Sequence, residues 1–305
     1  MSWPSPQEYN ETVQSPVACF ADAELKSGTI ALNQLGLPLV ASGSFASVYR
    51  IDCHPKSWAV RCFLRNVPDQ AIRYAAIAEC LGEHKLGFTV PFRYVENGIL
   101  VQGTWYPILK MRWVEGRTLE RVVEDHLKDA QALSVLAELF KTACAQLAES
   151  GIAHGDLQHG NIIVTASGAI YLVDYDGMFV PSLASMGSNE LGHKNYQHPG
   201  RCKQHFGAYL DNFSAWVIYT CLHALSVTPE YWNDLEGGDD CLLFRRKDFD
   251  QPQRSLCFAM LESSQDAITA RLARTVRCFL SLPVEQVPPL GSNLECRWIC
   301  LPCCL

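Results

Sequence analysis

The pattern of apolar positions predicts one helix most clearly, over residues 131–150. Its apolar side chains recur at intervals of three and four residues, the period of one helix face, at Leu133, Leu136, Phe140, Ala143 and Leu147. Gly151 comes directly after this stretch and is typical of a helix end. We therefore expect a helix that buries one face and leads directly into the segment that begins at residue 152.

Two short apolar runs follow this helix, at residues 162–164 and 170–173, and a small polar segment separates them. Runs of this kind around a turn predict a β-hairpin. A hairpin brings its open ends together, so the α-carbons of Asn161 and Asp174 should lie about 5 Å apart. Asp156 lies a few residues before Asn161. A carboxamide and at least two carboxylates therefore meet at one end of the hairpin, and such oxygen ligands suit Mg²⁺.

The remaining pattern divides the chain into a strand-rich first part and a helical second part. Strands are predicted at residues 37–40, 47–51, 57–64, 88–96 and 99–102 and a helix at 68–83, with Asn97-Gly98 as a tight turn. Residues 228–280 predict two or three helices, the last over 264–280. Residues 1–27 have three prolines and little periodicity, so we expect an arm or edge segment there.

Composition and charge narrow the class of protein. With 305 residues, 48% hydrophobic and 19% charged, the chain is globular. A net charge of −7 without a basic run argues against a nucleic-acid partner. The longest apolar run, 216–227, is too short to span a bilayer, and the 14 cysteines without a secretion signal indicate thiols in a reducing cytoplasm. We therefore expect a cytoplasmic protein with no membrane partner.

The order Asp, Asn, hairpin, Asp is the arrangement that phosphoryl transfer uses. One carboxylate orients and deprotonates the attacking hydroxyl, while the Asn and the second Asp bind the metal ions that bridge the phosphates. Residues 154–161, His-Gly-Asp-Leu-Gln-His-Gly-Asn, resemble the His-Arg-Asp catalytic loop of protein kinases. Asp174-Tyr175-Asp176 resembles their Asp-Phe-Gly motif. The chain thus resembles the eukaryotic-like Ser/Thr protein kinase superfamily.

Three more segments carry this resemblance in the correct order. Residues 106–119 resemble the last small-lobe strand and the hinge, and residues 192–199 resemble the Gly-Thr-x-x-Tyr-x-x-Pro end of the activation segment. Residues 211–218 resemble the start of the central large-lobe helix, whose Asp binds backbone N–H groups of the catalytic loop. Among relatives of this superfamily, the chain is most similar to bacterial kinase-like proteins with a His-Gly-Asp loop and an Asp-Tyr-Asp turn.

The resemblance implies an α+β, two-lobed protein-kinase-like fold. A small antiparallel β lobe with one main helix would span residues 28–112, and a larger, mainly α-helical lobe would span residues 113–280. Residues 1–27 would form an N-terminal arm. Residues 281–305 would form a Pro- and Cys-containing tail, which we expect to be a loose appendage. Its Cys-x-x-Cys motif has no His partner, so it is weak evidence for a zinc site.

The resemblance also implies a set of site residues. Asp156 would be the catalytic base, Arg61 would replace the phosphate-binding Lys, and Asn161, Asp174 and Asp176 would bind Mg²⁺. Glu79, or Glu83 one turn later, would pair with Arg61. ATP would lie between the lobes against Ala41, Ser42, Gly43, Ser44, Phe45, Ala46, Val48, Ala59, Arg61, Glu79, Met111 and Trp113. We further expect Asp156 to have a chemical role and little structural one.

The sequence departs from the kinase pattern at six positions of these motifs. Arg61 replaces a Lys, Ala41 and Ala46 replace loop glycines, Gly155 replaces the catalytic-loop Arg, Gln158 replaces a Lys, and Asp176 replaces a Gly. Three functions stay open: an active protein Ser/Thr kinase, a pseudokinase scaffold, and a small-molecule kinase of the aminoglycoside or choline type. Residues 192–199 and the Asp211 helix disfavour the third. The family resemblance suggests association with a PP2C-type phosphatase and a von Willebrand A-type protein.

Overall fold

The computed structural model describes residues 3–42, 45–238 and 240–292. The chain divides into two compact units. Unit 1 comprises residues 1–85 and 90–114, and unit 2 comprises residues 86–89 and 115–305. The last four cysteines of the sequence, at positions 296, 300, 303 and 304, lie outside the described residues.

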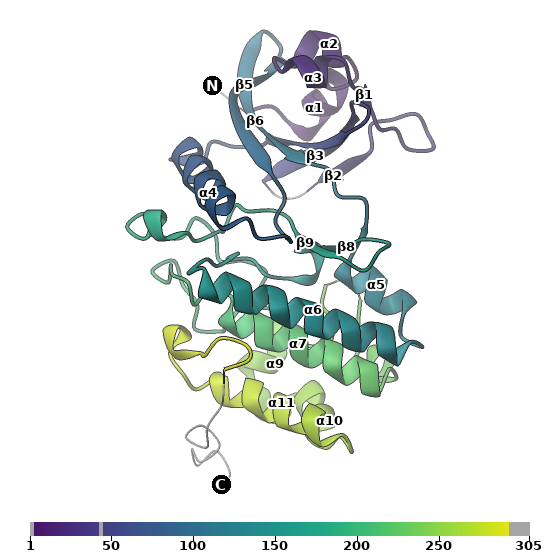
Figure 1. Cartoon of the computed structure of the whole chain (residues 1–305), viewed down its shortest axis with the longest axis vertical. Coiled ribbons are helices and arrows are strands. Elements are labelled where there is room, and N and C mark those ends of the chain that lie inside the picture. Colours follow the sequence, from purple (N-terminus) through teal and green to yellow (C-terminus); the bar gives the residue numbers. More distant parts are fainter. Residues whose placement is uncertain (1–2, 43–44, 239, 293–305) are drawn as a thin grey trace. The chain divides into compact units, whose positions relative to one another are not determined.

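Unit 1 is built on an antiparallel sheet in the order β1-β3-β4-β6-β5, and β2 also pairs with β3 (Figure 1). The strands are β1 (Thr29–Ile30), β2 (Val40–Ser42), β3 (Ala46–Asp52), β4 (Ser57–Phe63), β5 (Phe92–Val101) and β6 (Thr104–Arg112). One helix of 15 residues, α4 (Gln70–His84), accompanies the sheet. This is the small antiparallel lobe with one main helix that the sequence predicts.

The N-terminal segment is not the arm that we expected. It forms three short helices, α1 (Pro6–Thr12), α2 (Pro16–Cys19) and α3 (Ala23–Lys26). Their apolar side chains pack against one face of the sheet and are buried with Tyr49, Val60 and Ile108. The prolines begin helices: Pro6 is a first-turn residue after the N-cap Ser5, whose hydroxyl accepts from the Glu8 N–H. These residues therefore belong to the core of unit 1.

The second half of the sheet also corrects a predicted turn. Residues 92–101 form one continuous strand with an irregularity between Val95 and Ile99, and the tight turn lies at Gln102 and Gly103, both at positive φ. Asn97-Gly98 is inside the strand because the chain passes close to a neighbour there. A Cβ on Gly98 would lie 2.3 Å from Ile108. The prediction of a two-residue turn in this segment was therefore correct, but the predicted position is five residues too early.

Unit 2 is mainly helical and contains a small sheet in the order β7-β8-β9. Its helices are α5 (Leu119–Asp125), α6 (Ala130–Glu149), α7 (Asn212–Val227), α8 (Tyr231–Asp234), α9 (Arg246–Asp250), α10 (Leu256–Glu262) and α11 (Ala267–Phe279). Its strands are β7 (Arg117–Thr118), β8 (Ile162–Val164) and β9 (Ile170–Leu172), and its 3₁₀ turns are His159–Asn161, Pro181–Leu183, Pro252–Arg254 and Val284–Gln286. In Figure 1, α6 and α7 run side by side.

The core of unit 2 forms where the sequence predicts it. Helix α6 buries the face that carries Leu133, Leu136, Phe140, Ala143 and Leu147. Helix α7 is buried nearly all round, as expected for the central helix of a helical unit. None of the helices within the described residues is long and apolar enough to cross a membrane.

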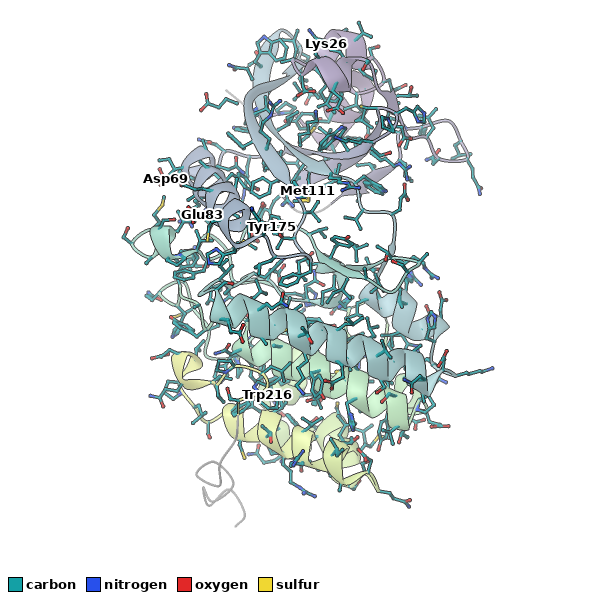
Figure 2. All side chains as sticks on the ribbon, in the orientation of Figure 1. Lys26, Asp69, Glu83, Met111, Tyr175 and Trp216 are labelled. Carbon is teal, nitrogen blue, oxygen red and sulfur yellow. The ribbon has the colours of Figure 1, made fainter. Side chains whose placement is uncertain are left out.

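Part of the predicted tail is packed and not loose. Val284, Val287 and Leu290 are buried, and two side chains of α7 bind the backbone here. Asn212 Nδ2 donates to the Val287 carbonyl at 2.7 Å, and Trp216 Nε1 donates to the Pro288 carbonyl at 2.9 Å. Trp216 is labelled in Figure 2. Residues 281–292 therefore belong to unit 2.

Candidate active site

The hairpin of unit 2 forms, but its register differs by one residue from the predicted one. Ile162 pairs with Leu172, and the Val173 N–H donates to the Asn161 carbonyl at 3.0 Å, so Val173 lies opposite Asn161 and Asp174 is the next residue at the open end. Asp174 has a φ of 66°, a left-handed conformation that Asp and Asn tolerate better than most residues. Gln158 Oε1 accepts from the Gly160 N–H at 2.8 Å and caps the 3₁₀ turn that carries Asn161.

Two glycines bring the catalytic-loop segment and the acidic turn into backbone contact. Gly155 has a φ of 79°, and a Cβ there would lie 1.9 Å from the Gly177 carbonyl oxygen. Any side chain at position 155 would therefore separate the two segments. This close approach gives a physical reason for Gly155 where protein kinases have Arg.

His154 and Tyr175 are buried side by side in the same two segments. His154 is fully buried, and its Nε2 lies 2.9 Å from the Val173 carbonyl. The buried ring of Tyr175 packs edge-on against it and donates its O–H to the Leu172 carbonyl at 2.8 Å. Tyr175, labelled in Figure 2, therefore orients the acidic turn through an internal hydrogen bond.

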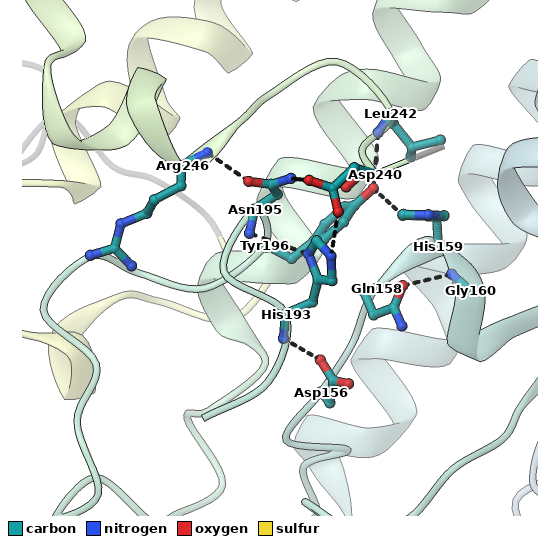
Figure 3. Close-up of polar contacts among 10 residues, drawn as sticks. All are labelled: Asp156, Gln158, His159, Gly160, His193, Asn195, Tyr196, Asp240, Leu242 and Arg246. Carbon is teal, nitrogen blue, oxygen red and sulfur yellow. Dashed lines mark hydrogen bonds and ion pairs between the residues drawn. The ribbon is translucent and has the colours of Figure 1, made fainter. Parts of the chain in front are cut away.

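Asp156 is held on both carboxylate oxygens, and Figure 3 shows the contact with His193. Oδ1 accepts from the His193 N–H at 2.6 Å, and Oδ2 accepts from Asn161 Nδ2 at 3.1 Å. The same Asn161 nitrogen donates to the Asp156 carbonyl at 2.9 Å. Our expectation of little structural role was wrong, because this side chain joins the 154–161 loop to the 192–199 segment. The close approach of Gly192, whose Cβ would lie 2.8 Å from Asp156 Oδ1, makes this bond possible.

Asp211 makes the contact that the sequence predicts. It occupies the position before α7, but its carboxylate accepts from the backbone N–H groups of His154 and Gly155, the latter at 2.8 Å. Burial raises the pKa of this carboxyl above its ordinary value, while His154 and the two N–H groups oppose that rise. Asp211 therefore positions the catalytic-loop segment from the α7 side.

Arg201 is a cation that the sequence analysis missed. Its side chain is 8% exposed, and one guanidinium nitrogen donates to the Gly155 carbonyl at 2.7 Å and to Gln197 Oε1. Burial lowers the pKa of Arg201, and the nearby carboxylates of Asp211 and Asp156 counteract this. A buried guanidinium thus lies among the acidic groups. The kinase motif did not identify Arg201, because the sequence already departs from that motif at the preceding residue, Gly200.

The segment that ends at Pro199 is fastened by side chains (Figure 3). His159 Nδ1 lies 2.5 Å from the Tyr196 hydroxyl, which also accepts from the Leu242 N–H at 2.9 Å. His193 and Asn195 both contact the Asp240 carboxylate, at 3.0 and 2.8 Å. This set ties the 3₁₀ turn, the 192–199 segment and residues 240–242 together without a phosphorylated residue.

The donor set at the hairpin fits Mg²⁺ in its chemistry. The Nδ2 of Asn161 is committed to Asp156, so Oδ1 is the atom of that amide able to ligate a cation. Asp174 and Asp176 supply carboxylates from the adjoining turn. Within the described residues, no three His, Cys, Asp or Glu side chains gather closely enough to hold a metal. Mg²⁺ is bound by one or two carboxylates together with substrate phosphates.

In unit 1, strand register gathers several of the predicted nucleotide-binding residues. Val48 pairs with Arg61, and Arg61 pairs with Leu109, while Ala59 pairs with Met111. Directly opposed residues of a sheet share a face. Val48, Ala59, Arg61 and Met111 therefore lie on one face, opposite the face that α1–α3 cover.

The remaining residues of the predicted nucleotide set are distributed around this face. Ala41 and Ser42 belong to β2, Ala46 to β3, and Phe45 is partly exposed beneath the Arg65 guanidinium. Gly43 and Ser44 lie outside the described residues. Trp113 follows β6, and its N–H donates to the Ser57 carbonyl at 2.9 Å. Glu79 and Glu83 are both exposed on α4, and Glu83 is labelled in Figure 2. The pairing of either with Arg61 stays a prediction.

Comparison with known proteins agrees with this geometry. The family profile of the ABC1 atypical kinase-like domain matches residues 98–182, which include the loop, the hairpin and the acidic turn. No curated protein is a significant match to the sequence. Among solved structures, the kinase PK-1 of the Cydia pomonella granulovirus is similar, with a TM-score of 0.57 and 13% identity. The match covers 91% of this chain and 96% of that one.

The chain therefore has a protein-kinase-like fold. The predicted α+β architecture, with an antiparallel sheet and a helical part, is confirmed. The family profile places a kinase-like domain over the segment on which the site is built.

Proposed function

We propose that this protein transfers the γ-phosphoryl group of ATP to a Ser or Thr hydroxyl of a protein. The observation that carries the proposal is the geometry of Asp156. Its carboxylate is fixed by one hydrogen bond on each oxygen, beside the turn that carries Asp174 and Asp176. Each oxygen keeps a second lone pair, so Asp156 can still accept the proton of an incoming hydroxyl.

The roles of the other residues follow from their chemistry. Asn161 Oδ1, Asp174 and Asp176 would bind Mg²⁺, which neutralises the charge of the nucleotide phosphates when bound. The sheet face of unit 1 with Val48, Ala59, Arg61 and Met111 would provide the nucleotide-binding side, with Arg61 on the phosphates. Asp211 and Arg201 position the loop through the backbone of residues 154–155.

The loop chemistry supports the bacterial subfamily with a His-Gly-Asp loop and an Asp-Tyr-Asp turn. Gly155 replaces the Arg that receives a phosphorylated activation segment in many kinases, and the 192–199 segment is instead bound by Asp156, His159 and Asp240. We infer that activity needs no phosphorylation of this segment. A PP2C-type phosphatase and a von Willebrand A-type protein are the partners that this subfamily suggests, and the cytoplasm is its compartment.

The test is phosphotransfer by the whole chain with Mg²⁺–ATP, read as phosphoserine or phosphothreonine by mass spectrometry. We expect the wild type to phosphorylate itself or a generic protein substrate. Asp156→Asn should lower the rate by at least about a hundredfold, the range of a lost general base. It should still bind Mg²⁺–ATP. Asp234→Asn, at an exposed position of α8, is the matched control and should leave the rate unchanged.

The same assay separates the other two candidate functions. A wild type that binds Mg²⁺–ATP, transfers no phosphate and is indistinguishable from Asp156→Asn would be a pseudokinase. ATP consumption that requires an aminoglycoside or choline, with no phosphoprotein formed, would identify a small-molecule kinase. Either result would contradict the proposal.

A further inference from the structure

Three side chains outside the candidate active site form a Cys-His-Glu series in unit 2. Cys202 Sγ lies 3.1 Å from His205 Nδ1, and His205 Nε2 lies 3.6 Å from Glu285 Oε2. Cys202 is partly exposed, and its neighbours Lys203 and Gln204 are exposed, so small reagents can reach the thiol. None of these three residues has a role in the proposed phosphotransfer.

A backbone contact determines which nitrogen of His205 carries the lone pair. The Cys202 N–H donates to His205 Nδ1 at 3.0 Å, so Nδ1 is the acceptor and Nε2 carries the proton of the neutral ring. The Cys202 thiol lies 3.1 Å from the same nitrogen and shares this lone pair with the backbone N–H. The Nε2–H faces Glu285, whose carboxylate stabilises the imidazolium once Nδ1 takes a proton.

A second Cys-His pair in the same chain has the opposite arrangement. Cys80 Sγ lies 3.7 Å from His84 Nδ1, but that nitrogen also lies 3.0 Å from the Cys80 carbonyl oxygen. A carbonyl can only accept, so His84 Nδ1 carries the proton and offers the thiol no lone pair. Burial is the main cause that raises the pKa of the Cys80 thiol, and the charges of Glu83 and Glu79 raise it further.

Seven further cysteines, buried or half-buried, are poor nucleophiles for another reason. The thiolate is the reactive form, and burial disfavours it. Burial raises the pKa of the thiols at Cys19, Cys53, Cys62, Cys144, Cys221, Cys241 and Cys257.

We propose that Cys202 is a site of covalent modification by small electrophiles and peroxides, with His205 as its base and Glu285 as the partner of the imidazolium. With iodoacetamide, His205 Nδ1 takes the thiol proton, sulfur bonds to the methylene carbon, and iodide leaves with the electrons of the C–I bond. With hydrogen peroxide, sulfur attacks one oxygen and the O–O bond breaks. The leaving hydroxide takes the proton from His205, so the thiol is oxidised to a sulfenic acid and the peroxide is reduced to water.

The location links this thiol to the candidate active site. Cys202 directly follows Arg201, whose guanidinium binds the Gly155 carbonyl. A group added to the sulfur is therefore carried by the residue that follows, in the chain, the cation that positions the catalytic-loop segment.

The test is the rate of alkylation of each cysteine in the folded chain by iodoacetamide at pH 7. Cleavage after Tyr196 and Phe206 yields a peptide of residues 197–206 with Cys202 as its one cysteine. We expect Cys202 to react about tenfold faster than Cys80, since a paired base raises the reactive fraction of a thiol. A dimedone adduct on the same peptide after hydrogen peroxide would identify the sulfenic acid.

The matched variants distinguish the effect of a neighbouring base on the reactivity of Cys202 from the effect of solvent exposure. His205→Asn keeps an oxygen that can accept the Cys202 N–H but cannot take a proton, and should slow alkylation of Cys202 about tenfold. Glu285→Gln should slow it about twofold, the size of a solvent-exposed ion pair. His84→Asn should leave Cys80 unchanged. Equal rates for Cys202 and Cys80, or an unchanged Cys202 rate in His205→Asn, would overturn the proposal. If His205→Asn melts below the wild type, Glu285→Gln decides: a slower rate supports the proposal and an unchanged rate overturns it.

Discussion

The two units position their candidate functional residues by different means. Around Asp156 in unit 2, side chains bind the backbone, and most of the donors and acceptors are buried. Around Arg61 in unit 1, the residues share a face because of strand register. We infer that single substitutions in unit 2 affect stability and chemistry together. In unit 1 they should affect nucleotide binding with little change in stability.

Removing Arg201 should have the largest effect on stability. Arg201→Met leaves the Gly155 carbonyl and Gln197 Oε1 without their donor and removes the cation near Asp211 and Asp156. We expect a loss of about 3 kcal/mol in the free energy of unfolding, as for other broken buried charge contacts. Urea unfolding measures it, with Arg254→Met at an exposed position as the control. A loss equal to that of the control would mean that this guanidinium does not support the loop.

Asp211→Ala should cause the next largest loss of stability. It leaves the buried N–H groups of His154 and Gly155 without an acceptor, at a cost of about 1–3 kcal/mol. Removal of a carboxyl whose pKa burial raises should also change the pH profile of unfolding. Because protonation of this group is easier in the folded state, its contribution to stability is greatest below pH 3.8 and falls as the pH rises through the raised value. Melting curves of the variant that overlie the wild type would contradict the assignment.

Arg61→Lys tests unit 1. We expect the free energy of unfolding to change by less than about 0.5 kcal/mol, as for substitutions that leave the core intact. The affinity for Mg²⁺–ATP should fall about fivefold, because a planar guanidinium fork and a compact ammonium bind phosphate differently. Isothermal titration with Arg112→Lys as the control measures this. A higher rate of phosphotransfer in Arg61→Lys would show that the pocket still suits the Lys of other kinases.

A pH-dependent effect on stability is expected far from the site, at the start of α11. Asp266 Oδ2 accepts from the Thr269 N–H at 2.7 Å and lies 3.0 Å from His223 Nε2. The Thr269 N–H, with His223, lowers the pKa of Asp266 to about 2. Since the folded value lies below the unfolded one, this contribution is complete above pH 3.8 and is lost as the pH falls towards 2.

Asp266→Ala should therefore cost about 1 kcal/mol at pH 7, the usual value of an N-cap. The difference from the wild type should shrink below pH 3.8. Urea unfolding between pH 3 and 7 would measure it. A difference that does not depend on pH would mean that the carboxylate is not the stabilising form.

Local patterns predicted unit 2 well because its elements are long or are bounded by clear turn residues. The predicted helix at 131–150 and the observed α6 differ by one residue at each end, and the 162–173 hairpin forms with its register shifted by one residue from the predicted one. The contact between Asp211 and the loop N–H groups could be predicted because the sequence motif around Asp211 resembles the one that makes this contact in protein kinases. The role of Arg201 could not, since a buried cation has no periodicity and its partners are backbone and amide oxygens.

Unit 1 was harder to predict because its N-terminal helices are too short to form alone. Helices of four to seven residues are marginal in water, so α1–α3 depend on packing against the sheet. Their prolines look like breakers in a pattern but begin helices in the structure. The turn was misplaced because Asn97-Gly98 is the stronger local signal, yet the close contact of Gly98 with Ile108 uses that glycine inside a strand.

The measurement that tests the central claim most directly is the thermal shift of the whole chain by ATP with and without Mg²⁺. A ligand in hundredfold excess over its Kd stabilises the folded state by about 2.7 kcal/mol, and we predict a rise in melting temperature that needs both ATP and Mg²⁺. Asp174→Asn fits the left-handed backbone at that position but removes a charged ligand, so the Mg²⁺-dependent part of the shift should disappear. No shift at millimolar Mg²⁺–ATP, or an unchanged shift in Asp174→Asn, would contradict the account.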